Sequence, residues 1–364
     1  MTDIAQITQL ARSILSDSNR TLGVDEAISE AVDMAYEQVV SSGSWNEDQI
    51  RKQVQSTLTG YGSLEELLLD PEVEEIWINS PTKVFISKNS QTSALELGLD
   101  ALAVRQTVEK MLRDSGRRLD RSVPFVDATL IDGSRLHVVI PDVTREHWAL
   151  NIRKFPASIL KMSDLVARQS LTLEMARYLK TQFTIGKNIL VSGATQAGKT
   201  TVLCALLEES ASSDRLISIE ETFEIRTSHP DWVAMQSRAA NLEGVGEVTL
   251  RRLVREALRM RPTRLIIGEV RQAEALDLLI ALNSGIAGIC TIHANSALDA
   301  IEKLKLLPLL AGENIPAKFV SDTVQRTIDL VIHTKMDQLA CRKISEVLVA
   351  NRSSGKTYWE EVQL

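Results

Sequence analysis

Apolar residues recur at helical spacing in three stretches near the start of the chain. The stripes run over residues 4–14, 24–39 and 50–58, and Asn46 is the expected N-cap of the third helix. Such stripes are typical of core packing and carry no recognisable chemistry. They predict a small helical bundle over residues 1–60.

The apolar period shortens over residues 61–156, where short β-type runs replace the helical stripes. Asp132-Gly133 separates two of these runs and is a strong β-hairpin signal. Helices are expected before Asp70-Pro71 and over residues 102–112. The expected strands are 75–78, 84–86, 126–131, 134–140 and 147–153. The pattern predicts a small α/β domain that closes at Phe155-Pro156.

Residues 157–364 have the pattern of a second, larger domain. After a linker and two helices (157–186), apolar strands alternate with helical patterns, which is typical of a mostly parallel, buried sheet. The expected strands are 189–191, 216–219, 233–236, 265–267 and 289–292, with helices at 250–260, 273–283 and 297–307. The tail is expected to form a helix, 317–326, and strands at 328–334, 343–350 and 357–364.

Composition narrows the class of protein. The net charge is −7, from 41 basic and 48 acidic residues, and 4% of residues are aromatic, which argues against a broad groove for nucleic acid. Cys204, Cys290 and Cys341 lie far apart and indicate reduced thiols in a cytosol. Because no apolar run has signal or membrane-span length, we expect a cytoplasmic protein without direct membrane insertion. Any association with the cytoplasmic membrane would then run through partners.

A strand, a glycine-containing loop and a helix follow one another over residues 187–201. The loop reads Gly193-x4-Gly198-Lys199-Thr200, the spacing of a phosphate-binding loop. Its N–H groups and the helix N-terminus bind phosphate, Lys199 reaches the β- and γ-phosphates, and the Thr200 hydroxyl binds Mg²⁺. The alternative is a strand–helix turn without a ligand. The predicted nucleotide-binding residues are Gly193, Ala194, Thr195, Gln196, Ala197, Gly198, Lys199, Thr200 and Thr201.

Hydrolysis of a bound nucleotide also needs a carboxylate that orients water and helps to hold the metal. Glu269 follows an apolar strand as the acid of a Walker B element does, and Gly268 is expected to let the backbone pass close to the phosphates. Glu220, followed by Glu221, ends another apolar strand. The alternative for each acid is a salt bridge at a strand end.

A histidine and a basic helix complete the candidates. His293 ends a third strand in line with the two acids and is a candidate sensor of the γ-phosphate, with a structural role as the alternative. The helix over 249–260 carries Arg251, Arg255 and Arg259 on one ridge. That ridge is either a solvated basic face or the source of an arginine that reaches the γ-phosphate across a subunit boundary.

Several stretches together resemble the secretion and pilus-assembly motor ATPases, most closely the branch that powers Tad-type pili (CpaF-like proteins). The resemblance covers about residues 60–350. The stretches that carry it are Asp70–Ile76, Gly133-Ser134-Arg135, Ile152–Phe155, Asn241–Gly244 through Arg261-Pro262, Gly268–Arg271 and Thr291–Ser296.

The resemblance implies a homohexameric ring of two-lobed subunits, with ATP and Mg²⁺ bound between an N-terminal domain and a RecA-like core. It implies that Glu269 activates water, and that Glu220 and His293 belong to the acidic box and the His box of the family. Catalysis would then rest on Lys199, Glu220, Glu269 and His293. The arginines expected to contact nucleotide are Arg135 and Arg153 from the N-terminal domain, with Arg238, Arg259 and Arg271 as weaker candidates.

The chain departs from the family pattern at three places. Ala194, Gln196 and Ala197 make the loop poorer in glycine, and Glu221 replaces the usual aspartate of the acidic box. The His box usually opens Gly-His-Asp-Gly, whereas this chain has Gly285-Ile286-Ala287-Gly288. That last change questions any polar relay ahead of His293.

The sequence therefore predicts a Mg²⁺-dependent ATPase motor that drives pilus assembly, pilus retraction or secretion through an inner-membrane platform protein. The expected hinge between the domains is Phe155–Ser158. Two alternatives stay open: a DNA-translocating conjugation motor, and a nucleotide-sensing scaffold with little turnover. The apparatus served, extension against retraction, the platform partner and the ring symmetry lie beyond the sequence.

Overall fold

The structure is a computed structural model with two compact units, Met1–Pro156 and Ala157–Leu364. It describes residues 4–16, 23–39, 47–58, 60–88, 90–155, 159–238, 240, 244–312, 314–338, 340–353 and 356–363. The expected cap Asn46 lies outside the described residues, as do Pro156, Ala157 and Ser158 of the expected hinge.

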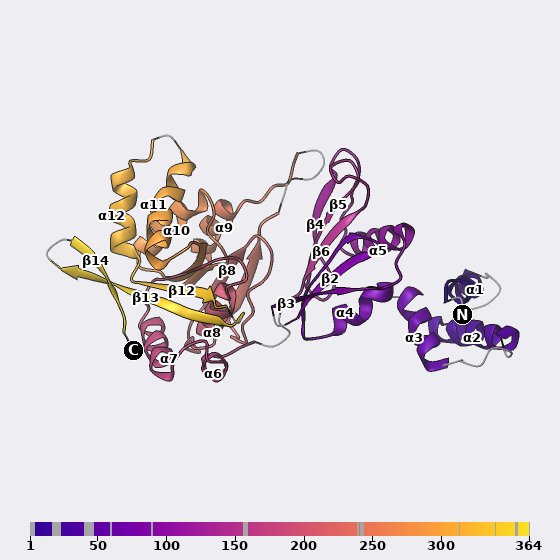
Figure 1. Cartoon of the computed structure of the whole chain (residues 1–364). Helices are drawn as coiled ribbons and strands as arrows, with labels where there is room; N and C mark the ends of the chain where they lie inside the picture. Colours follow the sequence, from indigo (N-terminus) through magenta and orange to yellow (C-terminus); the bar gives the residue numbers. More distant parts are fainter. Residues whose placement is uncertain are drawn as a thin grey trace. The chain divides into compact units, whose positions relative to one another are not determined.

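The first unit begins with three amphipathic helices, α1 (Ile4–Ser16), α2 (Val24–Val39) and α3 (Glu47–Leu58) (Figure 1). Their apolar stripes meet around the fully buried Ala11, Ala31, Val32 and Val54. Small side chains at the centre let the three helices approach closely. The predicted helices are confirmed, and burial of one stripe on each explains them.

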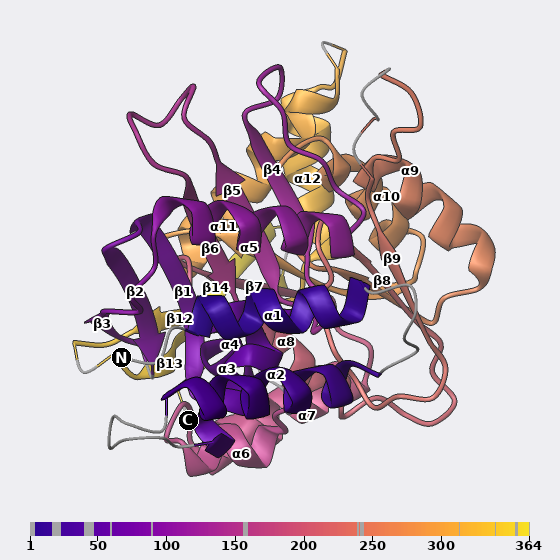
Figure 2. The same ribbon diagram turned by 90° about the vertical axis from the view of Figure 1, so that its right-hand side faces the viewer.

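An antiparallel sheet follows in the same unit, in the order β3-β2-β1-β6-β5-β4. Its strands are β1 (Val73–Ser80), β2 (Lys83–Lys88), β3 (Gln91–Leu95), β4 (Phe125–Thr129), β5 (Arg135–Val139) and β6 (Ala149–Arg153). The short helices η1 (Gly62–Leu64) and α4 (Glu65–Leu69) precede it, and α5 (Ala101–Asp114) packs on one face (Figure 2). Alternate strand residues such as Ile76 and Ile152 are therefore buried against α5.

The predicted hairpin is confirmed: β4 and β5 pair, and Gly133 adopts φ +86° in the connection. Sequence reasoning missed β3, because its five residues are mostly exposed and show no apolar alternation. Pairing with β2, rather than burial, makes it a strand.

The second unit is built on an eight-stranded sheet, in the order β14-β13-β12-β7-β11-β10-β8-β9. Strands β12 to β9 in this order are parallel, and β13 and β14 add an antiparallel hairpin. The strands are β7 (Ile189–Gly193), β8 (Leu216–Glu220), β9 (Trp232–Gln236), β10 (Arg264–Ile267), β11 (Ala287–His293), β12 (Leu330–Met336), β13 (Arg342–Ser353) and β14 (Lys356–Glu361).

Helices cover both faces of this sheet (Figure 1). One face carries α6 (Met162–Ala167), α7 (Leu173–Thr184) and α8 (Lys199–Leu207); the other carries α9 (Leu250–Ala257), α10 (Glu274–Asn283), α11 (Ala297–Leu306) and α12 (Ala317–Thr327), with the short η2 (Leu258–Met260) and η3 (Leu307–Ala311). The central strands are buried on both sides, which explains their continuous apolar runs. Among the described residues, no helix combines the length and apolarity needed to cross a membrane.

Candidate active site

The predicted phosphate loop joins the buried strand β7 to helix α8, which begins at Lys199. Gly193 ends the strand with φ +153°, and a Cβ there would lie 2.4 Å from the carbonyl oxygen of Thr334 on β12. Any side chain would therefore displace the neighbouring strand. The loop starts from a point that only glycine can occupy.

Lys199 lies folded into the loop and is buried. Its Nζ donates to the carbonyl oxygens of Gly193, at 3.2 Å, and Ala194, at 2.9 Å, and lies 3.1 Å from Nδ1 of His293. Two backbone carbonyl oxygens and one imidazole nitrogen, all neutral, thus hold the ammonium group at the place where a P-loop binds phosphate. An anionic phosphate is a stronger acceptor, so nucleotide would compete for the same three donor positions.

His293 connects this lysine to Glu269. Because an ammonium group only donates, the Nδ1 facing Lys199 accepts, and the ring proton is on Nε2, 3.0 Å from Glu269 Oε1. Burial lowers the pKa of His293, and the charge of Lys199 lowers it further. The imidazole is therefore neutral at neutral pH.

Glu269 is held by Arg271 in a two-point ion pair, with nitrogen–oxygen distances of 2.8 Å to each carboxylate oxygen. Burial raises the pKa of Glu269, but the hydrogen bond and charge of Arg271, with His293 and Lys199, outweigh it and keep the pKa below its usual range. Oε1 is buried and lies between Arg271 Nε, at 2.8 Å, and His293 Nε2, at 3.0 Å. Glu269 is thus an ionised carboxylate held between Arg271 and His293.

Glu220, at the end of β8, has the opposite environment. Its Oε1 accepts hydrogen bonds of 2.8 Å from the backbone N–H groups of Glu224 and Ile225, and the buried Oε2 has no partner among the described residues. Burial raises the pKa of Glu220 to about 7, against the lowering effect of the two backbone bonds. A Cβ at Gly268 would lie 2.9 Å from Glu220 Cγ. Gly268 makes room for this side chain, and its closeness to phosphate stays a prediction.

Glu224 was missed by sequence reasoning, which considered only acids at strand ends. Its Oε2 accepts from the Thr200 hydroxyl at 3.4 Å, so it is the carboxylate next to the predicted metal ligand. The signal was its spacing of four residues after Glu220, within the loop that follows β8. Glu221 lies instead on the outer side and pairs with Arg271 at 2.8 Å.

The predicted basic ridge runs over α9 and η2 and has a structural role at two of its three positions. Arg251 and Arg255 both bind the nearly buried Asp277 of α10, at 2.6 and 2.8 Å. Arg259 is largely exposed and pairs loosely with Glu256, and Arg238 donates to the carbonyl oxygen of Gly246. Among the described residues, none of these arginines shares a hydrogen bond or ion pair with the loop.

The altered opening of the His box lies far from the loop. Ala287 begins β11 and His293 ends it, so a strand rise of about 3.3 Å per residue separates them by roughly 20 Å. Ala287 pairs in register with Arg264, the first residue of β10. The Arg264 guanidinium is buried 3.7 Å over the ring of Phe183, and its Nε and Nη1 have no partner among the described residues. A direct relay from residue 287 to His293 is therefore excluded by geometry.

Arg135 and Arg153 lie side by side in the first unit, as a cross-strand pair of β5 and β6. Their neighbours Leu136 and Ile152 are buried against α5, so both arginines are on the opposite face of the sheet. Arg135 pairs with Asp127 at 3.3 Å. Their contact with nucleotide stays a prediction.

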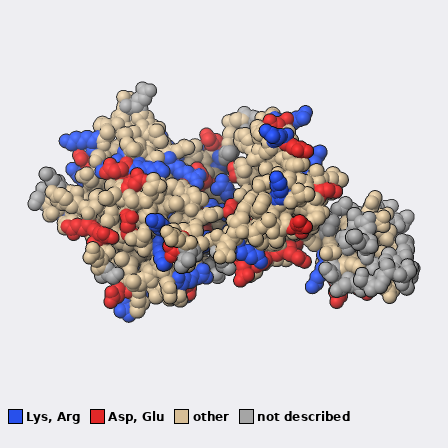
Figure 3. Space-filling model, in the orientation of Figure 1, with Lys and Arg blue, Asp and Glu red and all other residues tan. Residues whose placement is uncertain are grey.

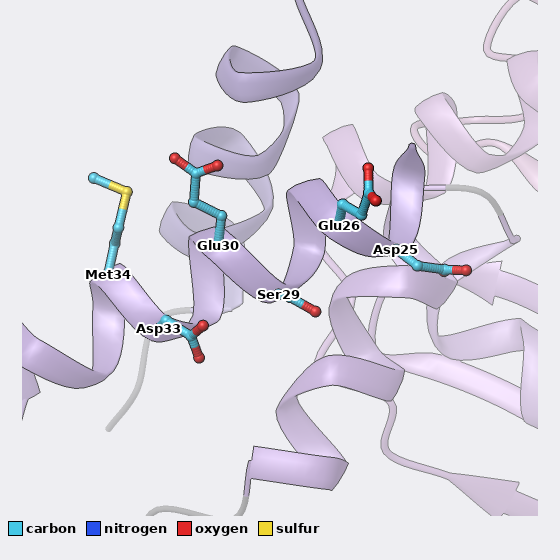
Figure 4. A pocket seen from close by; sticks show the side chains of 6 residues that line it. All are labelled: Asp25, Glu26, Ser29, Glu30, Asp33 and Met34. Carbon is cyan, nitrogen blue, oxygen red and sulfur yellow. The ribbon is translucent and has the colours of Figure 1, made fainter. Parts of the chain in front are cut away.

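A separate hollow lies along α2 of the helical bundle (Figure 4). Its lining residues are Asp25, Glu26, Ser29, Glu30, Asp33 and Met34. Four of these six residues are acidic, so the hollow repels a triphosphate. The P-loop therefore stays the predicted nucleotide site.

Comparison with known proteins agrees with this geometry. Residues 57–363 match the sequence model of the family described as type II/IV secretion system protein. A putative conjugal transfer protein of Mycobacterium tuberculosis (strain H37Rv) is 33% identical over 311 residues, which cover 83% of this chain and 88% of that protein. The type IV secretion system protein VirB11 of Bartonella henselae is 27% identical over 320 residues, covering 76% and 88%.

Among solved structures, the Legionella pneumophila ATPase DotB superposes with a TM-score of 0.58 at 19% identity, over 79% of each chain. This likeness concerns the fold alone, and it confirms the predicted α/β architecture with a RecA-like P-loop core. The family match covers most of the chain. The chain therefore belongs to the type II/IV secretion system protein family.

Proposed function

We propose that this ATPase works as a homohexameric, Mg²⁺-dependent motor that powers a pilus or secretion machine at the cytoplasmic membrane, within the Tad-type branch. The observation that carries the proposal is the line of contacts from Lys199 through His293 to Glu269 at the P-loop. A loop that only binds nucleotide needs no carboxylate behind its lysine. The family membership and the resemblance to CpaF-like proteins support the motor role.

In the proposed reaction, phosphate draws the Lys199 ammonium away from the carbonyl oxygens of Gly193 and Ala194. The loop N–H groups and the N-terminus of α8 bind the remaining phosphate oxygens. Glu269 accepts a hydrogen bond from water and orients it for in-line attack, with Arg271 fixing the carboxylate plane. Because Lys199 also contacts His293, its movement changes the hydrogen bonding of Nδ1, so the histidine senses whether phosphate is present.

Hard oxygen ligands suit Mg²⁺, and the residues around Thr200 supply them. The Thr200 hydroxyl would bind the ion, with Glu224 beside it and the unpaired Oε2 of Glu220 as a further acceptor. When bound, the ion neutralises charge on the phosphates.

The remaining arginines have proposed roles that follow from the resemblance. Residues 61–156 close over the nucleotide about the Phe155–Ser158 hinge, and this movement brings Arg135 and Arg153 to the phosphates. Arg238 and Arg259 act across a subunit boundary, where the largely exposed Arg259 is free to reorient.

Steady-state phosphate release tests the catalytic assignment. We expect Glu269→Gln to lower the rate by on the order of 10²-fold or more, because the amide accepts a water proton poorly. ADP binding should persist in this variant and should be lost in Lys199→Ala. Glu302→Gln, on the exposed surface of α11, is the matched control and should hydrolyse normally.

Wild-type turnover by Glu269→Gln would show that Glu269 is not the catalytic carboxylate. A wild-type protein that binds ADP but releases no phosphate would instead favour the nucleotide-sensing scaffold. The motor role needs a cellular readout: a strain that carries only Glu269→Gln should lack surface pili or secreted substrate, and the purified ring should co-purify with an inner-membrane platform protein.

A conjugation motor that moves DNA is the second candidate, and the similarity to a putative conjugal transfer protein favours it. On the face shown in Figure 3, basic and acidic side chains are interspersed and form no continuous basic surface. Together with the net charge of −7, this argues for a protein partner. ATPase stimulation by single- or double-stranded DNA would reverse that preference.

A further inference from the structure

An arginine of the C-terminal hairpin contacts the outer side of the P-loop. Arg342 is the first residue of β13, and its Nε donates a hydrogen bond of 2.9 Å to the carbonyl oxygen of Gln196 at the loop apex. Its aliphatic stem lies against Gly198, where an added Cβ would be 3.4 Å from Arg342 Cδ and 3.6 Å from Cβ. One side chain therefore touches both ends of the loop's tightest segment.

That segment has an unusual backbone. Gln196 adopts φ +62° and Gly198 φ +91°, so a non-glycine residue occupies the left-handed region at the apex. Such a conformation persists only when surrounding contacts hold it. The Arg342 bond is one of those contacts.

The bond also fixes the direction of the next amide. The C=O and N–H of a trans peptide point to opposite sides, so a Gln196 carbonyl turned toward Arg342 directs the Ala197 N–H into the loop. In the structure this N–H donates to the carbonyl oxygen of Ala194 at 3.3 Å. Inward N–H groups are what a P-loop offers to phosphate.

The hairpin that presents Arg342 is itself anchored. On β12, the Thr334 hydroxyl donates to the carbonyl oxygen of Ser192 at 3.0 Å, and His333 Nδ1 lies 2.9 Å from Ser192 Oγ. In the turn, Asp337 accepts from the N–H of Cys341. The start and the apex of the loop are thus both attached to the β12–β13 hairpin.

We propose that Arg342 is a positioning residue for nucleotide binding, which holds the P-loop apex in its phosphate-binding form. The proposal rests on the P-loop as the nucleotide site and is independent of the machine that the ATPase serves. Because Arg342 acts on the loop and not on Glu269 or His293, its loss should weaken nucleotide binding more than it slows the chemical step.

The test compares two arginines of the same strand. Arg342→Met removes the donor and keeps the apolar stem. Arg352→Met is the matched control, because Arg352 donates its Nε to the carbonyl oxygen of Gln325, at 3.0 Å, at the other end of β13. Fluorescent ADP titration, thermal melting without nucleotide and ATPase kinetics are measured on the full chain.

We expect Arg342→Met to raise the Kd for ADP and the KM for ATP by about tenfold, the value of one charge-assisted hydrogen bond, with kcat within about twofold of wild type. Arg342→Lys should recover part of the affinity. Arg352→Met should lower Tm and leave the Kd unchanged.

Wild-type ADP affinity in Arg342→Met, or an equal loss of affinity in Arg352→Met, would overturn the proposal. A protein whose ADP affinity depends on Arg342 but that powers no pilus would contradict the proposed motor role and leave this inference intact. Lys199→Ala loses ADP binding in either case and so reports on the P-loop itself.

Discussion

At the scale of single residues, Glu220 and Glu269 are two carboxylates whose surroundings shift their pKa values in opposite directions. Burial without a cationic partner raises the pKa of Glu220 to about 7, whereas Arg271 and its neighbours hold that of Glu269 down. Environments that separate two acids in this way often mark different roles in one reaction. Here the ionised Glu269 is suited to water, and Glu220 to sharing a proton or a metal ion.

The raised pKa of Glu220 predicts a pH-dependent stability. The native state holds this proton more tightly than the unfolded chain does. The protonated carboxyl therefore contributes its full stabilisation of the fold below pH 4.5, and this stabilisation is lost as pH rises to about 7. Glu220→Gln should remove this fall in the free energy of unfolding with rising pH, which is about 3 kcal/mol at most. We expect similar Tm values at pH 5, and a higher Tm for the variant at pH 8, in thermal melts with EDTA and no nucleotide. An equal Tm difference at both pH values would contradict the shift.

The sequence predicted that Lys199, Glu269 and His293 lie close together, because each lies in a motif or at the end of an apolar strand. The fold brings these three side chains into contact. Glu224 was not predictable, because its position depends on how the loop after β8 turns back toward Thr200. The contact of Gly268 with Glu220 was not predictable for the same reason. Its neighbour is a side chain from another strand, and only the fold reveals it.

At the scale of elements, the parallel strands β10 and β11 both begin at the level of a buried arginine, Arg264. They end at the edge of the sheet that carries Glu269 and His293. Arg264 begins β10 beside Ala287, and its guanidinium keeps two nitrogen atoms without partners among the described residues. Burial lowers the pKa of Arg264, as expected for a charge with little compensation. The resemblance places an aspartate where this chain has Ala287, which accounts for the missing partner.

Ala287→Asp should therefore stabilise the fold by restoring an ion pair with Arg264. A charged hydrogen bond contributes about 1.5–3 kcal/mol, which corresponds to a rise in Tm of several degrees. Ala287→Asn is the control, because asparagine has the size of aspartate. Its Tm should rise less than that of Ala287→Asp, because asparagine lacks the charge. Both variants should hydrolyse ATP as wild type does, since residue 287 is remote from His293. A lower Tm for Asp than for Asn would contradict the expected pair.

Strong apolar runs made the central strands predictable, because burial on both faces demands them. Strands at the edge of a sheet were harder to predict from the sequence. Strand β3 exists through pairing with β2 alone, and the bounds of β14 depend on its hairpin with β13. The ridge of α9 showed the correct spacing, but its partner Asp277 comes from a separate helix that the local pattern does not reveal.

At the scale of the whole molecule, each unit has its own buried core, and the contacts from Lys199 through His293 to Glu269 lie entirely in the second. The first unit offers the adjacent Arg135 and Arg153 on the sheet face that α5 leaves uncovered. A motor needs chemistry in one unit to change the position of another. These arginines are the groups through which we propose that coupling.

Arg153→Gln in the full chain tests the coupling between the units. If Arg153 reaches phosphate in the closed state, kcat/KM for ATP should fall by about 10–100-fold, because a charge that stabilises the transition state is lost. Arg121→Gln, a highly exposed arginine of the same unit, should have no effect. Unchanged kinetics in Arg153→Gln would remove the N-terminal arginines from the site.

The position of β7 in its sheet has a consequence for biosynthesis. β7 is flanked by β11 and β12, whose residues follow those of β7 by about 100 and 141 positions along the chain. On the ribosome, this wholly buried strand therefore emerges long before either neighbour, and its edge toward β12 stays unpaired until residue 336 has been made. Such distant pairing slows folding and exposes the strand to aggregation. We therefore expect nucleotide, if it binds at the loop after β7, to stabilise the chain only after these distant strands have paired.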